Sequence, residues 1–466
     1  MHNAELQLRE LWNNHKLDPD ALTRIQLTGS EPVLPSSFST GTAAQVSIAA
    51  AAAMAAEIGH LRGLPKQTVT VDMLQAAIEC TALFTVDDES TPAFAELSGL
   101  YLCKDGWIRL HANFDHHRDA ALQVLDLPVG ADTPRSDVEA KAALYEKQAL
   151  EEAILDNGGA CAVVRTIAEW DALEQSKAVA RLPLVEITRL GEAEPKQHPT
   201  LKDKQAPLAG IRVLDLTRIL AGPVCGRTLA AYGADVMLIN SPVLPNIQSI
   251  VETSRGKLSA HINLHIESDK KKLDNLIADA QVFVQGYRPG SLATHGLTPE
   301  SIAEQNPGIV YTSLSAYGRT GPFSSRRGYD SLLQSASGFN MAEAQAMQSS
   351  APQALPVQIL DYASGFLMAF GTQVALQKQM TQGGSWHVQV SLARTGLWLR
   401  SMGQSAENLS CPKPDPHEYL QSYESSWGAL KALPHAPAFS HSKVGWTRPS
   451  TKPGSDPAQW PAPQPG

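Results

Sequence analysis

The chain has 466 residues, of which 43% are hydrophobic, so it is long and apolar enough to bury a sizeable core in two or three domains. Its formal net charge is -9 and it contains no long Lys/Arg run, which argues against nucleic acid and anionic membrane as partners. Five scattered cysteines without a C-x-x-C spacing, and an N-terminus without a signal-peptide or transit-peptide pattern, predict a reduced, cytoplasmic protein.

The N-terminal half mixes helical and strand-like patterns. Residues 1–40 predict a helix followed by a Pro/Ser-rich loop, and residues 41–200 predict a smaller α+β domain. That domain opens with an alanine-rich helix from Thr42 to Leu61. Alternating or apolar runs then predict strands over 68–72, 106–110 and 159–164, with helices over 138–157 and 165–178.

A polar linker, 191–205, leads into a second domain that we assign to residues 201–398. Apolar strands alternate with helical segments there, which predicts a doubly wound, mostly parallel, Rossmann-like α/β sheet. The expected strands cover 211–216, 235–239, 281–284 and 308–313. Residues 399–466 are rich in Pro, Ser and His, and they predict an extended surface tail that is partly disordered at its end.

Two distant segments resemble each other. The run from Thr68 to Met73 parallels the run from His387 to Leu392, and the small-residue helices before them start near Thr42 and Asp361 at the same offset. This pattern predicts an internal structural repeat, although a chance match of two common patterns stays open.

Familiar cofactor motifs are absent from the sequence. It has no G-x-G-x-x-G after the first strand of the second domain, no P-loop, no G-x-S-x-G and no H-E-x-x-H, so we expect neither NAD nor a metal ion. His111, His116 and His117 lie close together, but their spacing matches no zinc motif. We expect them on a solvated loop.

Five segments in order, between Pro207 and Trp398, resemble the family III CoA-transferases, the group that includes carnitine dehydratases, formyl-CoA transferases and alpha-methylacyl-CoA racemases. The most distinctive parts of these segments are Arg218-Ile-Leu-Ala-Gly-Pro223, Arg255-Gly-Lys257, Gly286-Tyr-Arg-Pro-Gly290, Gly328-Tyr-Asp330 and Asp361-Tyr-Ala-Ser-Gly365. The first half resembles the same family more faintly, so the chain looks like two reordered partial copies of one family subunit.

The resemblance implies an enzyme that moves CoA from an acyl-CoA to a carboxylic acid, with CoA as substrate and covalent intermediate. Asp361 matches the family's catalytic aspartate. A carboxylate can attack a thioester to give an aspartyl anhydride and then an aspartyl-CoA thioester. On the residues alone, Asp361 can equally be an ordinary helix N-cap. The equivalent residue of the first half, Thr42, cannot act as such a nucleophile.

The CoA-binding residues are also carried over from the resemblance. They are Arg218, Ile219, Leu220, Ala221, Arg255, Lys257, Gly286, Tyr287 and Arg327. Each has a plainer interpretation: a strand–helix turn for 218–221, a solvated turn for 255–257, simple packing for Tyr287 and a surface position for Arg327.

The chain departs from the family at several positions. Tyr329 stands where racemases carry His, and a tyrosine with an unperturbed pKa near 10 carries protons poorly at neutral pH. His295 stands where many relatives carry Arg, and no glycine-rich lid is present. Transferase is therefore the first hypothesis. A 2-methylacyl-CoA racemase or isomerase and a non-catalytic acyl-CoA-binding protein are the alternatives. The reordered halves leave a homodimer open.

Overall fold

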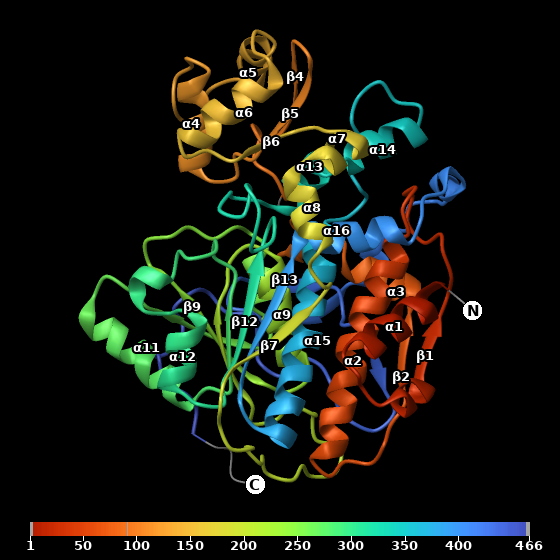
Figure 1. The fold of residues 1–466 in the computed structure, drawn as a ribbon, viewed down its shortest axis with the longest axis vertical. Helices are drawn as coiled ribbons and strands as arrows, with labels where there is room; N and C mark the ends of the chain where they lie inside the picture. The colour runs from red at the N-terminus through yellow and green to blue at the C-terminus, as the bar shows by residue number, and fades with distance from the viewer. Residues whose placement is uncertain (1–2, 91, 463–466) are drawn as a thin grey trace.

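A seven-stranded sheet lies at the centre of the computed structural model, which describes residues 3–90 and 92–462 (Figure 1). The strand order is β10-β9-β8-β11-β12-β13-β7, and all neighbours are parallel except the edge strand β7. The predicted doubly wound, mostly parallel α/β sheet is confirmed. Its strands are β7 Glu186–Gly191, β8 Arg212–Leu216, β9 Asp235–Asn240, β10 Lys257–His261, β11 Val282–Gln285, β12 Val310–Ser315 and β13 Ser385–Ser391.

The two faces of this sheet pack into separate apolar cores because successive strand residues point to opposite sides. Val213 and Val282 face a core shared with α2, α9 and α15, whereas Leu214 and Phe283 face a smaller core shared with α11 and α12. The helices of this domain are α9 Ala221–Ala231, α10 Ile250–Thr253, α11 Glu267–Asp279, α12 Pro299–Gln305, α15 Ile359–Gln382 and α16 Leu392–Ser401, with a short 3-10 turn, η2, at Ala293–His295.

Residues 3–80 pack beside α15 in the large domain (Figure 1). The alanine-rich helix α2 is almost completely buried, because its small side chains let it lie close to α15. The prediction of one domain over 41–200 therefore misses a division, since α2 and β7 both belong to the large domain. The elements here are α1 Asn3–Asn14, η1 Pro19–Arg24, β1 Ile25–Thr28, α2 Thr40–Leu61, β2 Val69–Asp72 and α3 Met73–Glu79.

A small α+β domain with its own core lies at the top of Figure 1. It contains β4 Gly99–Cys103, β5 Gly106–Leu110, β6 Cys161–Val163, α4 Asp115–Val124, α5 Arg135–Ala142 and α6 Lys147–Asp156. Its three strands form an antiparallel sheet in the order β4-β5-β6. Four short helices lie between this domain and the large sheet: α7 Ile167–Ala172, α8 Glu174–Ala180, α13 Asp330–Ala336 and α14 Phe339–Ala346.

The C-terminal segment, 402–462, is a folded strap along the surface. Its strands β14 Gln421–Tyr423 and β15 Leu430–Ala432 extend β3 Phe84–Val86, and β16 Ala438–Phe439 pairs with β2. Two 3-10 turns, η3 Ala406–Ser410 and η4 Pro416–Tyr419, precede them. The disorder that we predicted at the very end concerns 463–466, which lie outside the described residues.

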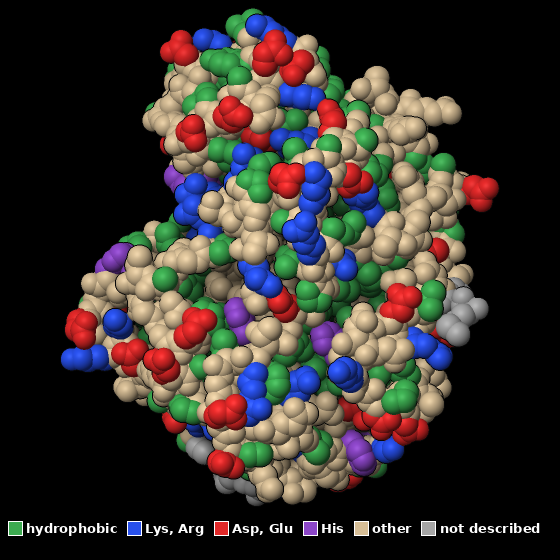
Figure 2. Space-filling model, in the orientation of Figure 1, with side chains coloured by type: hydrophobic (Ala, Val, Ile, Leu, Met, Phe, Trp, Pro, Cys, Tyr) green, Lys and Arg blue, Asp and Glu red, His purple; other side chains and the backbone are tan. Residues whose placement is uncertain are grey.

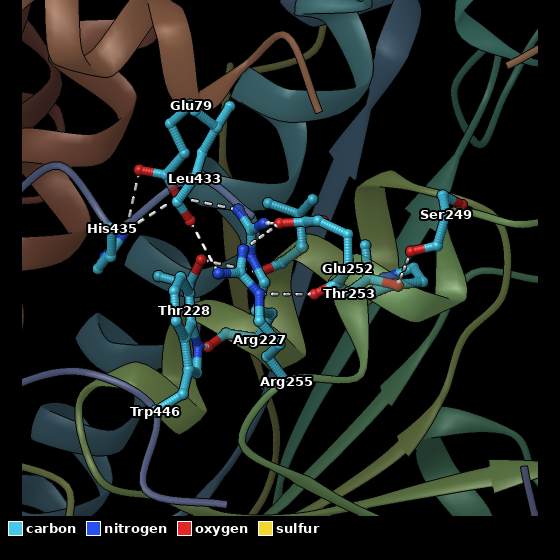
Figure 3. Close-up of polar contacts among 12 residues, drawn as sticks. Glu79, Arg227, Thr228, Ser249, Glu252, Thr253, Arg255, Leu433, His435 and Trp446 are labelled. Carbon is cyan, nitrogen blue, oxygen red and sulfur yellow. Dashed lines mark hydrogen bonds and ion pairs between the residues drawn. The ribbon is translucent and has the colours of Figure 1, made fainter. Parts of the chain in front are cut away.

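A buried network of ion pairs and hydrogen bonds connects the strap to α3, α9 and α10 (Figure 3). Arg227 of α9 pairs with Glu79 of α3 at 2.9 Å and with Glu252 of α10. Arg255 donates to Glu252 at 2.6 Å and to the Leu433 carbonyl of the strap at 2.8 Å. These arginines and glutamates are at most 2% exposed, so each charge depends on its partners.

Helices α2 and α15 are the two described helices that are long and apolar enough to cross a membrane. Of the most apolar stretch of each, 94% and 100% are buried inside the protein, so both are core helices of this fold.

The predicted internal repeat is visible in the local geometry. Asp72 caps α3 by accepting from the Gln75 N–H, and Ser391 caps α16 by accepting from the Arg394 N–H, 319 positions later in each case. The residues before α2 and α15, Ser39 and Gln358, share φ/ψ near -78° and 61° at the same offset. Helix, strand and short helix are therefore repeated as one unit.

Candidate active site

Asp361 lies in the first turn of α15, and its side chain is 7% exposed. It forms part of the walls of two cavities, which also share Ile219, Leu220 and Tyr329. The sequence placed this carboxylate at a helix start, which the structure bears out. Asp361 is not the N-cap itself, because Gln358 occupies that position and Asp361 lies inside the first turn.

A second buried carboxylate, Asp330, does the capping instead. The Asp361 N–H donates to Asp330 Oδ2 at 2.9 Å, and Gln334 Nε2 donates to Asp330 Oδ1 at 2.5 Å. Burial raises the pKa of Asp330 to about 6. Burial, together with the Asp330 charge, raises the pKa of Asp361 well above its ordinary value. Two buried acids thus share one site, and the charge of Asp330 disfavours ionisation of Asp361.

The first copy of the internal repeat contains only one of the two acids of this pair. The Thr42 N–H donates to Glu31 Oε1 at 2.6 Å, just as the Asp361 N–H donates to Asp330. Thr42 occupies the place of Asp361, as the sequence predicted. The capping acid is therefore present in both halves, and the second carboxylate in only one.

The strand order explains why the site lies here. The chain builds the sheet outward from β8 through β9 to β10 and then crosses to β11, so the turns after β8 and β11 diverge at a topological switch point. Ligands of open α/β sheets bind at such points. The turn after β8 is strained, since Ile219 is a β-branched residue with φ 76°.

Asp215 and Lys257 hold that turn in place. The Thr217 N–H and hydroxyl both donate to Asp215 Oδ1, at 3.0 and 2.6 Å. Lys257 Nζ donates to Asp215 Oδ2 at 2.9 Å and to the Pro223 carbonyl at 2.8 Å. Sequence reasoning assigned no role to Asp215, although it lies in the first of the five motif segments.

Six of the nine residues predicted to bind CoA line the narrower cavity with Asp361. They are Arg218, Ile219, Leu220 and Ala221 after β8, and Gly286 and Tyr287 after β11. Arg288, which the sequence analysis did not single out, lines this cavity and also an adjoining one of about 190 Å³ along β11, β12 and β13. Together they form a groove that ends at Asp361.

Three arginines gather near this groove. Arg218 and Arg288 lie on its walls, and the Arg288 charge contributes with burial to lowering the pKa of the half-buried Arg327. None of the three forms an ion pair with an acid of the described residues. Figure 2 shows Lys and Arg side chains collected along the junction between the small domain and the rest of the molecule. Such unpaired guanidinium groups suit a phosphate-bearing ligand.

Two of the residues predicted to bind CoA, Arg255 and Lys257, lie outside this groove. Arg255 and Lys257 are each 1% exposed and are fully engaged by protein partners. Neither lines a described cavity near Asp361. Their placement does not support direct contact with a ligand, because desolvated cations at those positions are held by Glu252 and Asp215.

The histidine group is not on a solvated loop, contrary to our expectation. His111 and His117 are 5% and 2% exposed, and His111 stacks on Tyr329 with ring centroids 3.7 Å apart. Burial lowers the pKa of both histidines to about 3, so they are neutral at pH 7. Within residues 3–90 and 92–462, no group of three His, Cys, Asp or Glu side chains could hold a metal ion.

Residues 208–422 match the model of CoA-transferase family III. An acyl-CoA transferase of Gibberella moniliformis is 27% identical over 417 residues, which cover 80% of this chain and 73% of that protein. The probable fatty acyl-CoA transferase Rv3272 of Mycobacterium tuberculosis is 32% identical over 228 residues, or 45% of this chain and 57% of that one. A crystal structure of Rv3272 aligns with 42% of this chain and 56% of its own, at 31% identity and TM-score 0.38.

The human succinyl-CoA:glutarate CoA-transferase is 34% identical over 193 residues, which cover 38% of this chain and 43% of that protein. The chain thus spans between 43% and 73% of the length of these relatives. The segment that matches the family model contains the switch point and α15.

Proposed function

Because residues 208–422 belong to CoA-transferase family III, we propose that this protein transfers CoA from an acyl-CoA to a free carboxylic acid, with Asp361 as the nucleophile. The observation that carries the proposal is the position of this carboxylate, buried in the first turn of α15 where an arginine-bearing groove meets a second cavity. A buried nucleophile shielded from water favours acyl transfer over hydrolysis.

The proposed reaction starts with the ionised Asp361. One carboxylate oxygen attacks the thioester carbonyl carbon, the C–S bond breaks, and CoA leaves as a thiolate, which yields a mixed anhydride. The thiolate then attacks the aspartyl carbonyl of this anhydride, which releases the first carboxylic acid as its anion and leaves an aspartyl-CoA thioester. The acceptor carboxylate attacks that thioester and reverses the sequence with the new acyl group, so that free Asp361 is regenerated.

Two features of the site support this chemistry. Asp330 holds the Asp361 N–H, which fixes the first turn of α15 and the orientation of the nucleophile. The raised pKa of Asp361 means that its carboxylate is desolvated and destabilised, so it attacks more readily once ionised. The rate should then increase with pH as Asp361 ionises, above the ordinary pKa range of an aspartate.

The groove with Arg218 and Arg288 supports the binding of the phosphate end of CoA. Arg288 borders both the narrow cavity and the adjoining one, so a long ligand can extend past it towards Asp361. No metal or nicotinamide cofactor takes part in the proposed reaction. Acyl-CoA and a carboxylic acid are its partners.

The experiment that tests the proposal is covalent trapping. The full chain is incubated with an acyl-CoA and then with borohydride or hydroxylamine, and the modified peptide is mapped by mass spectrometry. We expect modification of Asp361 alone and none in the Asp361→Asn variant. An unmodified Asp361 under conditions where CoA exchange proceeds would exclude this nucleophile.

The racemase alternative is tested in the same samples. Tyr329 replaces the expected histidine, and burial raises the pKa of its phenol to about 12, so it is a poor proton carrier at neutral pH. Deuterium incorporation at the α-carbon of a 2-methylacyl-CoA from D₂O, without CoA exchange, would favour the racemase. If Asp361→Ala leaves acyl-CoA affinity and cellular role unchanged, the chain is a binding protein.

A further inference from the structure

The second cavity beside Asp361 has a volume of about 820 Å³. Its walls include four short runs of the chain besides residues from elsewhere: Cys80–Phe84, Pro92–Glu96, Asn246–Ser249 and Pro356–Gln358. The first two belong to the N-terminal half, outside the matched family segment. The cavity is therefore built jointly by the matched segment and by residues outside it.

Most of the cavity surface is apolar. Leu83 and Phe84 enter from β3 and the turn before it, Phe94 from the following loop, and Ile247 and Val357 from the large domain. A volume of this size is within the range of pockets that enclose ligands of ~20 or more heavy atoms, far beyond a formyl or acetyl group.

The ionisable residues on these walls are acids or neutral groups. Glu96, Asp330 and Asp361 are the acids, and His111 has its pKa lowered to about 3 by burial, so it carries no charge at pH 7. No Lys or Arg is found among the described residues that line the cavity. Arg109 lies over the Phe94 ring, 5.3 Å from its centroid, and is not one of the lining residues.

The two cavities meet at Asp361 and differ in charge. The narrow one has arginine walls and suits the phosphates of CoA, whereas the large one has apolar and acidic walls. A thioester whose carbonyl carbon is at Asp361 must place its CoA half on one side and its acyl half on the other. The acyl half then enters the large cavity.

We propose that the large cavity binds an uncharged acyl chain of medium length, and that the enzyme discriminates against dicarboxylic acyl groups such as glutaryl. This inference rests on the proposed function and goes on to name its substrate class. A terminal carboxylate in this cavity would lose its hydration next to three acids without gaining a cation, which is unfavourable. Each added methylene, in contrast, buries apolar surface.

The test compares acyl-CoAs of equal length. Pentanoyl-CoA and glutaryl-CoA differ by a terminal carboxylate, and a series from acetyl- to decanoyl-CoA varies the chain alone. We measure kcat/KM with one fixed acceptor and, separately, the Kd for the Asp361→Asn protein, so that binding is read without turnover. We expect pentanoyl-CoA to be preferred at least about 100-fold, and kcat/KM to rise about threefold to fourfold per methylene until the cavity is filled.

Gln248 offers a matched pair of variants on the cavity wall, since it is exposed and has no part in the proposed chemistry. Gln248→Arg adds the missing cation and should raise the ratio of glutaryl to pentanoyl activity at least about 10-fold, whereas Gln248→Met should not change it. Leu83→Trp should shorten the longest acyl chain that is accepted, because the larger side chain fills part of the cavity. Melting curves confirm that each variant is folded.

Two outcomes would overturn the inference. One is a preference for glutaryl-CoA that is lost in Arg109→Gln, which would show that Arg109 reaches the ligand. The other is an equal kcat/KM and Kd for all chain lengths. If CoA transfer proceeds and Asp361 is trapped while either result holds, only the acyl preference is wrong. If Asp361 is never modified, the proposed function fails independently.

Discussion

Substitution of Asp330 tests how much the ionisation of a buried carboxyl group in this site lowers the free energy of unfolding. Its carboxylate is completely buried, accepts the Asp361 N–H and has its pKa raised from 3.8 to about 6. A folded-state pKa above the unfolded value means that the folded protein binds the proton more tightly. The stabilisation from this group is complete below pH 3.8 and is lost as pH rises towards 6. The difference of about 2 pKa units corresponds to ~3 kcal/mol.

Asp330→Asn removes this ionisation but keeps an amide oxygen that can accept the same N–H. At pH 4 its free energy of unfolding should equal that of the native chain within about 1 kcal/mol. At pH 8 it should exceed the native value by up to ~3 kcal/mol, because the native protein alone carries the buried charge. Urea denaturation at pH 4, 6 and 8 measures the difference. Asp330→Ala is the control, since it leaves the helix N–H without a partner and should be destabilised at every pH.

The same substitution bears on catalysis. Without the Asp330 charge the pKa of Asp361 should fall, so the acid limb of the kcat/KM profile should move to lower pH. A pH-independent difference in stability together with an unmoved acid limb would refute the coupling of these two carboxyl groups.

Three further outcomes are expected. Asp361→Asn should abolish CoA transfer and raise the melting temperature at pH 8, with a smaller gain at pH 5, because ionisation of the native carboxyl opposes folding as pH rises through its raised pKa. Arg288→Gln should raise the KM for acyl-CoA about 10-fold or more in low salt, whereas Arg189→Gln, at an exposed ion pair, should leave it unchanged. Arg227→Met should lower the free energy of unfolding by roughly 3–5 kcal/mol, since it strands buried acids, and Lys177→Met at a surface pair should change it by less than ~0.5 kcal/mol.

The large sheet and its switch point could be predicted because they depend on local patterns. Apolar runs such as 211–216 and 281–284 are typical of buried parallel strands, and β8 and β11 lie where those runs predicted them. The motif around Asp361 likewise placed the start of α15 to within a few residues, although the helix begins at Ile359 and Asp361 is inside its first turn. Periodicity and motif order carry this information in short stretches of sequence.

Long-range pairing could not be predicted in the same way. Nothing near Glu79 in sequence indicates that it faces Arg227, and β7 gives no local sign that it joins the edge of the sheet beside β13. Arg255 and Lys257 illustrate the same limit. A cation beside a glycine is typical of a surface turn, and only the packed structure shows that Glu252 pairs with Arg255 and Asp215 pairs with Lys257. The large cavity also depends on residues 80–96, whose role becomes visible only after the halves are packed together.

Residues 430–446 of the C-terminal strap affect the order in which the protein can fold during synthesis. A ribosome makes the helices bearing Glu79 and Arg227 long before it makes Leu433, His435 and Trp446, which cover them. Until those last contacts form, the guanidinium groups of Arg227 and Arg255 and their partner acids are not covered by the strap. Nascent chains stalled upstream of Leu433 should therefore be open to proteases and chaperones around Glu79, whose neighbour Cys80 lines the large cavity.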